Sequence, residues 1–170
     1  MKENSYGVIP FLFKKNGVYI LLYKSSKNSN VYNFVKGKPL NTKETIKNTI
    51  KREVKEEIGI TISKKDLETY FFYASPRKDI GLYTINFEKY KSKKIIVEKS
   101  EIYSVKWFNI KNLPEISKNQ KKFITDIMVK FENIDFLLKS NNIKSKVISN
   151  EKKVIVNAIK RKKNVAKKNS

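Results

Sequence analysis

Three glutamates lie close together in a chain that is otherwise poor in acid. Glu53, Glu56 and Glu57 stand three and four positions apart, so on a helix their carboxylates project from one face within a turn. Carboxylate oxygens suit Mg²⁺ and Mn²⁺, and a bound divalent ion activates water for attack on phosphorus. The alternative for such a cluster is a solvated helix face paired with neighbouring lysines and Arg52.

The 170-residue chain contains no His and no Cys. This composition excludes disulfides, zinc sites built from Cys or His, thiol nucleophiles and imidazole bases. Acid–base or metal chemistry therefore rests on carboxylates, Lys or Tyr, and any metal is a hard, oxygen-liking ion.

The net charge is strongly positive, with 38 Lys and Arg against 16 Asp and Glu, which gives +22. Such a surplus indicates a polyanionic partner, most simply nucleic acid, with an anionic membrane surface as the lesser possibility. The chain is also rich in Lys, Asn and Ile and has only three Arg. This bias is typical of an AT-rich gene, which would raise the Lys content without selection for binding.

The basic residues are densest at the C-terminal end. Residues 141–170 hold ten Lys and Arg against one Glu, which gives this segment a net charge of +9. Within it, Lys160, Arg161, Lys162 and Lys163 form a basic cluster that is predicted to bind nucleic acid.

The glutamates fall on a predicted helix over residues 41–59. Apolar residues recur at every fourth position, which indicates one buried stripe. The stripe consists of Ile46, Ile50, Val54 and Ile58. Thr42 is expected to cap the start of this helix, and Gly59 lies where a helix-ending glycine belongs.

Apolar, β-branched and aromatic runs on both sides of this helix predict strands. The expected strands are residues 6–15, 18–26, 31–35, 67–74, 80–90 and 102–108. Asn16-Gly17 predicts a hairpin between the first two strands. A second amphipathic helix is expected over residues 117–138. This order of elements indicates a mixed α/β or α+β sandwich.

The surroundings of the glutamates resemble the signature of the Nudix hydrolase superfamily. That signature runs Gly, five residues, Glu, seven residues, then Arg-Glu-apolar-any-Glu-Glu-any-Gly-apolar. Here Glu44 is followed, after seven residues, by Arg52-Glu53-Val54-Lys55-Glu56-Glu57-Ile58-Gly59-Ile60. Six residues rather than five separate Gly37 from Glu44, so either the loop carries one extra residue or Lys38 replaces the signature glycine.

The resemblance implies a fold and an activity. The implied fold is a Nudix-type α/β/α sandwich with a mixed sheet over residues 1–140, followed by a basic C-terminal helix or tail over residues 141–170. The implied activity is hydrolysis of a nucleoside diphosphate linked to another group, with Mg²⁺ or Mn²⁺ as cofactor.

The resemblance also implies roles for single residues. The implied metal ligands are Glu53, Glu56, Glu57 and the carbonyl of Gly37. Arg52 resembles the arginine that orients a glutamate, and a salt bridge to Glu44 or Glu56 is compatible with that role. The general base is a helix glutamate such as Glu57 or a distal carboxylate. Among distal carboxylates the predicted base is Glu101, with Glu98 as the second candidate.

The segment Tyr32-Asn33-Phe34-Val35-Lys36-Gly37-Lys38 resembles the Trp-Gly-Phe-Pro-Lys-Gly-Lys entry of mRNA-decapping and dinucleoside-polyphosphate members. The resemblance implies that Tyr32, Lys36 and Lys38 bind substrate, although each lysine is also consistent with simple solvation. Three further aromatic residues are candidates for stacking a base, and at least two of them are expected in the core instead. These residues are Tyr70, Phe72 and Tyr73.

Three functions remain open at this level. The first is an enzyme that acts on RNA 5′ ends, by decapping or pyrophosphate removal. The second is a hydrolase of dinucleoside polyphosphates or damaged nucleoside triphosphates. The third is an RNA-binding Nudix module without catalysis, against which the intact, mutually repelling glutamates argue. Because the N-terminus lacks a signal peptide and no long apolar run occurs, a cytoplasmic protein without a membrane span is expected.

Overall fold

The computed structural model describes residues 2–97 and 102–140, with side chains through residue 132. The chain divides into a first unit, residues 1–132, and a second unit, residues 133–170. The first unit contains the sheet and the three glutamates. The domain boundary expected after residue 140 stays a prediction, and the basic segment 141–170 lies outside the described residues.

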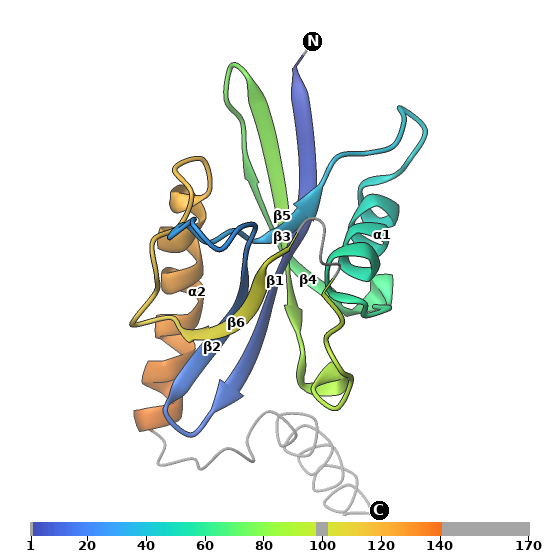
Figure 1. The fold of residues 1–170 in the computed structure, drawn as a ribbon. Helices are drawn as coiled ribbons and strands as arrows, with labels where there is room; N and C mark the ends of the chain where they lie inside the picture. The colour runs from blue at the N-terminus through green and yellow to red at the C-terminus, as the bar shows by residue number, and fades with distance from the viewer. Residues whose placement is uncertain (1, 98–101, 141–170) are drawn as a thin grey trace, which may run out of the picture. The chain divides into compact units, whose positions relative to one another are not determined.

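A mixed six-stranded sheet forms the centre of the first unit (Figure 1). Its strands are β1 (Glu3–Lys14), β2 (Gly17–Lys24), β3 (Val35–Gly37), β4 (Leu67–Tyr73), β5 (Lys78–Asn86) and β6 (Ser104–Asn109). The strand order is β4-β5-β1-β2-β6, and β3 pairs with β1 beside this path. The β1–β5 pair is parallel and the other pairs are antiparallel. The long β1 therefore joins all parts of the sheet.

Two helices cover opposite faces of this sheet (Figure 1). Helix α1 (Ile46–Ile58) buries the predicted apolar stripe against one face, where it meets Val8 of β1 and Val35 of β3. Helix α2 (Lys121–Ser140) packs on the other face, with the ring of Phe131 centred 4.9 Å from that of Phe11. The expected α/β/α sandwich with a mixed sheet is confirmed. No helix in the described part of the chain is long and apolar enough to cross a membrane.

Several predicted element boundaries differ from those in the structure. The strand expected over 31–35 forms later, at β3, and the preceding residues make only isolated bridges. The strand expected over 80–90 begins earlier, at Lys78, and ends at Asn86. A 3₁₀ turn, η2 (Glu88–Tyr90), follows it because the buried Tyr90 turns inward, where its hydroxyl donates to Asp66. Asp66 closes the other 3₁₀ turn, η1 (Lys64–Asp66), and helix α2 starts at Lys121 rather than at residue 117.

The start of α1 also differs from the expectation. Thr42 is not the cap, because the Asn41 side chain organises the turn before the helix by accepting from the backbone N–H of Lys43 and Glu44 at 2.9 and 3.1 Å. The cap is Thr45, whose hydroxyl accepts from the N–H of Asn48 at 3.3 Å. The predicted C-cap is confirmed: Gly59 has a φ of 72° and donates to the carbonyl of Lys55.

The two threonines provide a matched test of this cap. Thr45→Ala should lower the free energy of unfolding by about 1 kcal/mol, because a helix N-terminal N–H loses its side-chain acceptor. Thr42→Ala removes the same hydroxyl from an exposed position outside the cap and should change stability by less than about 0.5 kcal/mol. Urea unfolding followed by circular dichroism measures both values, and an equal effect of the two changes would contradict the assignment.

Candidate functional site

Helix α1 positions the three glutamates beside the short strand β3. Three members of the apolar stripe of α1, Ile50, Val54 and Ile58, are fully buried against the sheet, and Ile46 is partly buried. The residues next to that stripe therefore reach the sheet edge. Glu57 is buried, Glu53 is partly buried and Glu56 is exposed. The burial of Glu57 is notable because an ionised carboxylate is rarely buried unless it has hydrogen-bond partners.

Two of the glutamates contact the backbone of β3 directly. An oxygen of Glu57 accepts from the N–H of Lys36 at 3.1 Å. The carboxylate of Glu53 lies against Gly37 so closely that a Cβ atom added to Gly37 would come within 2.0–2.1 Å of the carboxylate atoms. The sequence places these residues far apart, and the packing of α1 on the sheet brings them together. Gly37 is therefore needed here for close approach and not for an unusual backbone angle.

Arg52 binds the acidic residues on both sides of it. Its Nε and Nη2 donate to the two oxygens of Glu44 at 3.0 and 3.2 Å. Its Nη1 donates to Glu53 at 2.6 Å and to Glu56 at 2.8 Å. Its Nη2 also donates to the carbonyl of Lys38 at 2.7 Å. The guanidinium thus links the loop after β3 to the face of α1, and the predicted pairing with Glu44 and with Glu56 is present.

Glu44 is held as a permanent anion by this contact. The hydrogen bond from Arg52 is the main reason that the pKa of Glu44 falls to about 2, and the N–H of Leu40 also donates to its carboxylate at 2.7 Å. The same contact raises the pKa of Arg52 further, so the pair stays charged at any physiological pH. Glu44 therefore orients Arg52, which in turn holds Glu53.

Lys36 lies on β3 between the glutamates and a second lysine. Burial lowers the pKa of Lys36, and repulsion from Lys78 lowers it further, while Glu57 and Glu53 act in the opposite direction. A partly buried ammonium whose charge is disfavoured by burial and by a second lysine is a position where an anionic group gains favourable contacts.

The donor set fits a hard divalent cation in type, because it offers only carboxylate and carbonyl oxygens. Among the described residues, no three acidic side chains converge on one point where a metal ion would sit. Instead Arg52 engages Glu53 and Glu56, and the backbone of β3 engages Glu57. Glu53 and Glu56 thus share Arg52 as a common cationic partner, while Glu53 lies against Gly37 and Glu57 against the N–H of Lys36.

The other predicted site residues either have described partners outside the group of three glutamates or lie outside the described residues. Lys38 pairs with Glu3 at 2.7 Å on the surface. Tyr32 packs edge-on against Phe108 of β6, with ring centroids 4.8 Å apart, and its backbone N–H donates to the carbonyl of Glu115 in the loop after β6. Glu98 and Glu101 lie outside the described residues. The basic cluster also lies outside them, and it consists of Lys160, Arg161, Lys162 and Lys163.

The expectation that at least two of the three aromatic stacking candidates lie in the core is wrong. Tyr70 is 37% exposed and Phe72 is 54% exposed. Tyr73 is partly buried, and the ammonium of Lys122 lies 4.2 Å from the centre of its ring. Tyr70 and Phe72 are thus available to a partner.

Sequence reasoning missed one polar residue that organises the approach to β3. Gln120 is buried, and its carbonyl oxygen accepts from the N–H of Phe34 at 2.7 Å. Its amide nitrogen donates to Asn33 at 2.9 Å and to Ser117 at 2.6 Å. The sequence carries no local signal for this role, because Gln120 lies next to a polar, lysine-rich helix start and two of its partners, Asn33 and Phe34, are distant in sequence.

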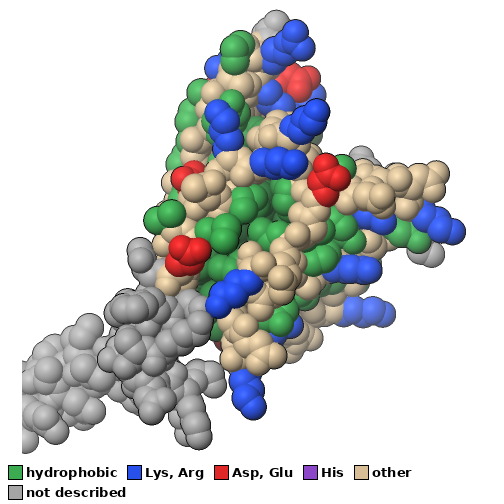
Figure 2. All heavy atoms as spheres, turned by 90° about the vertical axis from the view of Figure 1, so that its left-hand side faces the viewer, with side chains coloured by type: hydrophobic (Ala, Val, Ile, Leu, Met, Phe, Trp, Pro, Cys, Tyr) green, Lys and Arg blue, Asp and Glu red, His purple; other side chains and the backbone are tan. Residues whose placement is uncertain are grey.

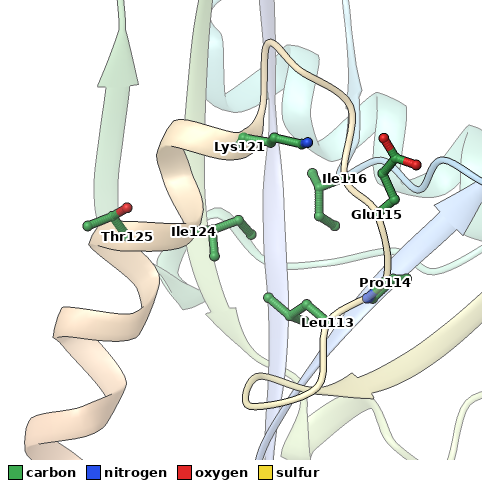
Figure 3. Close-up of a pocket in the computed structure, with 7 residues that line it drawn as sticks. All are labelled: Leu113, Pro114, Glu115, Ile116, Lys121, Ile124 and Thr125. Carbon is green, nitrogen blue, oxygen red and sulfur yellow. The ribbon is translucent and has the colours of Figure 1, made fainter.

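A pocket of about 340 Å³ lies between the loop after β6 and the start of α2 (Figure 3). Apolar side chains form its wall, with Lys121 and Glu115 as its charged residues. Lys121 extends across it from α2 toward the loop (Figure 3). The glutamates of α1 do not line this pocket.

Comparisons with known proteins agree with this geometry. The NUDIX domain profile matches residues 1–127. An 8-oxo-dGTP diphosphatase from Buchnera aphidicola subsp. Acyrthosiphon pisum is 36% identical over 87 residues, which are 51% of this chain and 68% of that protein. A MutT structure from work on Aliivibrio salmonicida and Vibrio cholerae matches with a TM-score of 0.61 at 15% identity, covering 77% of this chain and 100% of that one.

A MutT/nudix family protein from Enterococcus faecalis matches with a TM-score of 0.54 at 19% identity. The match covers 64% of this chain but only 44% of that protein, so this chain spans less than half of its length. At such identities the structural matches support the fold, and the sequence match over residues 1–127 identifies the domain.

Proposed function

The chain belongs to the Nudix hydrolase family, and from this premise we propose that it is a pyrophosphohydrolase acting on RNA 5′ ends, by decapping or by pyrophosphate removal. The observation that carries the proposal is the group of carboxylates on α1 beside β3, set within a strongly basic surface. The carboxylates suit the chemistry of the family, and the basic surface suits a polyanion longer than one nucleotide.

The proposed roles rest on the family signature, and the contacts of Glu53 and Glu57 at β3 support them. Glu53, Glu56 and Glu57, with the carbonyl of Gly37, would hold Mg²⁺ or Mn²⁺, which when bound supplies a water of lowered pKa. For the reaction, a water oxygen would bond to phosphorus while an anhydride P–O bond breaks and the leaving phosphate departs, and a carboxylate of the chain would accept the water proton. Glu101 is the proposed acceptor, with Glu57 as the alternative on the helix.

The basic side chains of the site would bind the substrate. Lys36 is proposed to meet a phosphate oxygen, since its ammonium is partly buried and is influenced electrostatically by Lys78, Glu57 and Glu53. Lys38 adds a second positive charge directly after the end of β3. Arg52 keeps Glu53 in place through its pairing with Glu44. Its role is therefore to position a ligand and not to contact the reacting phosphorus.

The distribution of charge favours an RNA end over a single nucleotide. Residues 1–140 contain 28 Lys and Arg against 15 Asp and Glu, so the surplus is not confined to the C-terminal segment. Figure 2 views the first unit from the side of α2, opposite to α1, and on that face Lys and Arg side chains are more common than acidic ones and border a hollow with apolar side chains. The affinity for a nucleic-acid strand increases with the number of cations that contact its phosphates. The cluster Lys160, Arg161, Lys162 and Lys163 would extend this contact.

A second candidate is hydrolysis of a modified nucleoside triphosphate or a dinucleoside polyphosphate. The 36% identity to a protein named 8-oxo-dGTP diphosphatase favours it. On this reading the lysine surplus reflects the composition of the gene, and the same carboxylates cut a small substrate.

A side-by-side substrate test separates the two candidates. Purified full-length protein is given triphosphate RNA, capped RNA, diadenosine tetraphosphate and 8-oxo-dGTP, each with Mg²⁺ or Mn²⁺, and the products are resolved by chromatography. The proposal expects the highest kcat/KM on one of the RNA substrates. Equal or faster turnover of 8-oxo-dGTP or of the dinucleotide would replace it by the second candidate.

A further inference from the structure

Three aromatic side chains form a continuous patch on the sheet face that α1 covers. Tyr70 and Phe72 on β4 and Tyr83 on β5 make up this set, which we name the aromatic platform. The rings of Tyr70 and Phe72 are stacked with centroids 6.3 Å apart, and Tyr70 lies 4.5 Å from Tyr83. Phe72 and Tyr70 are the more exposed members. Neighbouring exposed aromatic rings on a strand offer apolar surface to a partner.

A glycine makes room for this platform. A Cβ atom at Gly81 would lie 2.1 Å from the hydroxyl oxygen of Tyr70, so the phenol of Tyr70 leans over the bare backbone of β5. Burial, with the nearby Tyr6 and Tyr83, raises the pKa of Tyr70 to about 12. Tyr70 therefore stays uncharged at physiological pH.

Strand register places the platform in line with the glutamates. Tyr6 of β1 pairs with Gly37 of β3 on one side and with Gly81 of β5 on the other, and Gly81 pairs with Phe72 of β4. Paired residues project from the same face, so these four positions form one row. At about 4.8 Å per strand, Phe72 lies about 14 Å from Gly37. That distance is about four nucleotides of a stacked strand at about 3.4 Å each.

A row of cations runs beside the platform. Lys43, Lys47, Lys51 and Lys55 stand four positions apart at the start of α1 and along it, all four are exposed, and we name them the lysine row. The ammonium of Lys47 lies 5.7 Å from the ring centre of Tyr83, which joins the row to the platform. None of the four forms a salt bridge with another residue of the described ranges 2–97 and 102–132.

We propose that the aromatic platform and the lysine row bind single-stranded RNA a few nucleotides downstream of its 5′ end, with bases stacked on the platform and phosphates against the lysines. The combination of exposed aromatic faces with a line of cations is what single-stranded nucleic acid requires. A protein or lipid partner of the lysine row would have no need for stacked rings. The statement that the bound strand is also a substrate rests on the proposed function, whereas the statement that the strand binds does not.

The platform is tested with an RNA that cannot be hydrolysed. A short, fluorescently labelled, 5′-hydroxyl single-stranded RNA is titrated with full-length protein, and binding is read by fluorescence anisotropy. Phe72→Ala should weaken binding about 5- to 100-fold, because a stacked base loses its aromatic partner. Phe72→Leu, which keeps apolar bulk without a π face, should also weaken it, whereas Phe72→Tyr should bind as the wild type does. Tyr103→Ala removes a similarly exposed aromatic ring near Lys24 and should leave binding unchanged.

The lysine row is tested by salt dependence. The double change Lys47→Ala and Lys51→Ala should reduce the slope of log Kd against log salt by about 1.4, since each phosphate contact on a single strand contributes about 0.7. The matched control changes Lys15 and Lys106 to Ala. Both are exposed, and Lys15 lies in the turn after β1, at the opposite end of that strand from Tyr6. The control alters the net charge equally and should keep the wild-type slope.

Several outcomes would overturn the proposal. The proposal fails if the wild-type protein does not bind the 5′-hydroxyl RNA at low salt. It also fails if Phe72→Ala keeps the wild-type affinity, or if the two lysine double variants have equal salt slopes. A change in oligomeric state of Phe72→Ala in sedimentation, with unchanged RNA affinity, would assign the platform to a second copy of this chain instead. Because the RNA carries no 5′ phosphate, failure of the proposed hydrolysis and failure of this surface are separate results.

Discussion

Glu57→Gln should lower the rate of nucleotide hydrolysis about 100-fold or more while the protein stays folded. The change keeps the size of the side chain and its carbonyl oxygen, which can still accept from the N–H of Lys36. It removes the negative charge that would bind a divalent ion. It also relieves repulsion from Glu53 and Glu56, so the unfolding temperature should stay the same or rise slightly.

The matched control for this variant is Glu115→Gln. Glu115 is exposed in the loop after β6, away from α1, and the change alters the net charge by the same amount. Turnover is measured by product release at several Mg²⁺ concentrations, and folding by circular dichroism during heating. If Glu57→Gln turns over at close to the wild-type rate, Glu57 is not a ligand, and the buried carboxylate serves only to hold β3 against α1.

The elements that position the site could largely be predicted, because they depend on local pattern. The four-residue apolar repeat of α1 and the glycine at its C-cap depend on helix geometry alone, and both are confirmed. The N-cap was placed at Thr42 and lies at Thr45, because the Asn41 side chain forms a competing turn. The end of β5 was missed because Phe87 and Tyr90 are as apolar as strand residues, and only the distant Asp66 shows why the chain turns there.

The contacts within the site could not be predicted, because they join residues that are far apart in sequence. The spacing of the glutamates indicates a shared helix face, but not that Glu57 accepts from the N–H of Lys36 or that Glu53 touches Gly37. Both contacts depend on how closely α1 packs on β3. The parallel pairing of β1 with β5, which aligns Tyr6 with Gly81, is likewise a property of the whole sheet.

Gly37→Ala should abolish most of the hydrolytic activity with little loss of stability. The backbone of Gly37 does not have a positive φ, so alanine fits the local conformation. Its Cβ atom would instead come within 2.1 Å of the carboxylate of Glu53, and the flexible end of that side chain must move away. Folding tolerates such a shift, but Glu53 then leaves both Gly37 and its place beside Glu57. A fall in turnover of about 10- to 100-fold is expected, together with a higher Mg²⁺ requirement.

Gly7→Ala is the informative contrast, because the same added methyl group meets a rigid neighbour. At Gly7 the new Cβ atom would lie 2.0 Å from the carbonyl oxygen of Val35, which is part of β3 and cannot rotate away. Gly7→Ala should therefore lower the unfolding temperature, whereas Gly37→Ala should lower turnover at a nearly unchanged unfolding temperature. Thermal unfolding and magnesium-dependent kinetics on both variants separate the two effects. Full activity of Gly37→Ala would show that the position of Glu53 beside Gly37 is not required for the reaction.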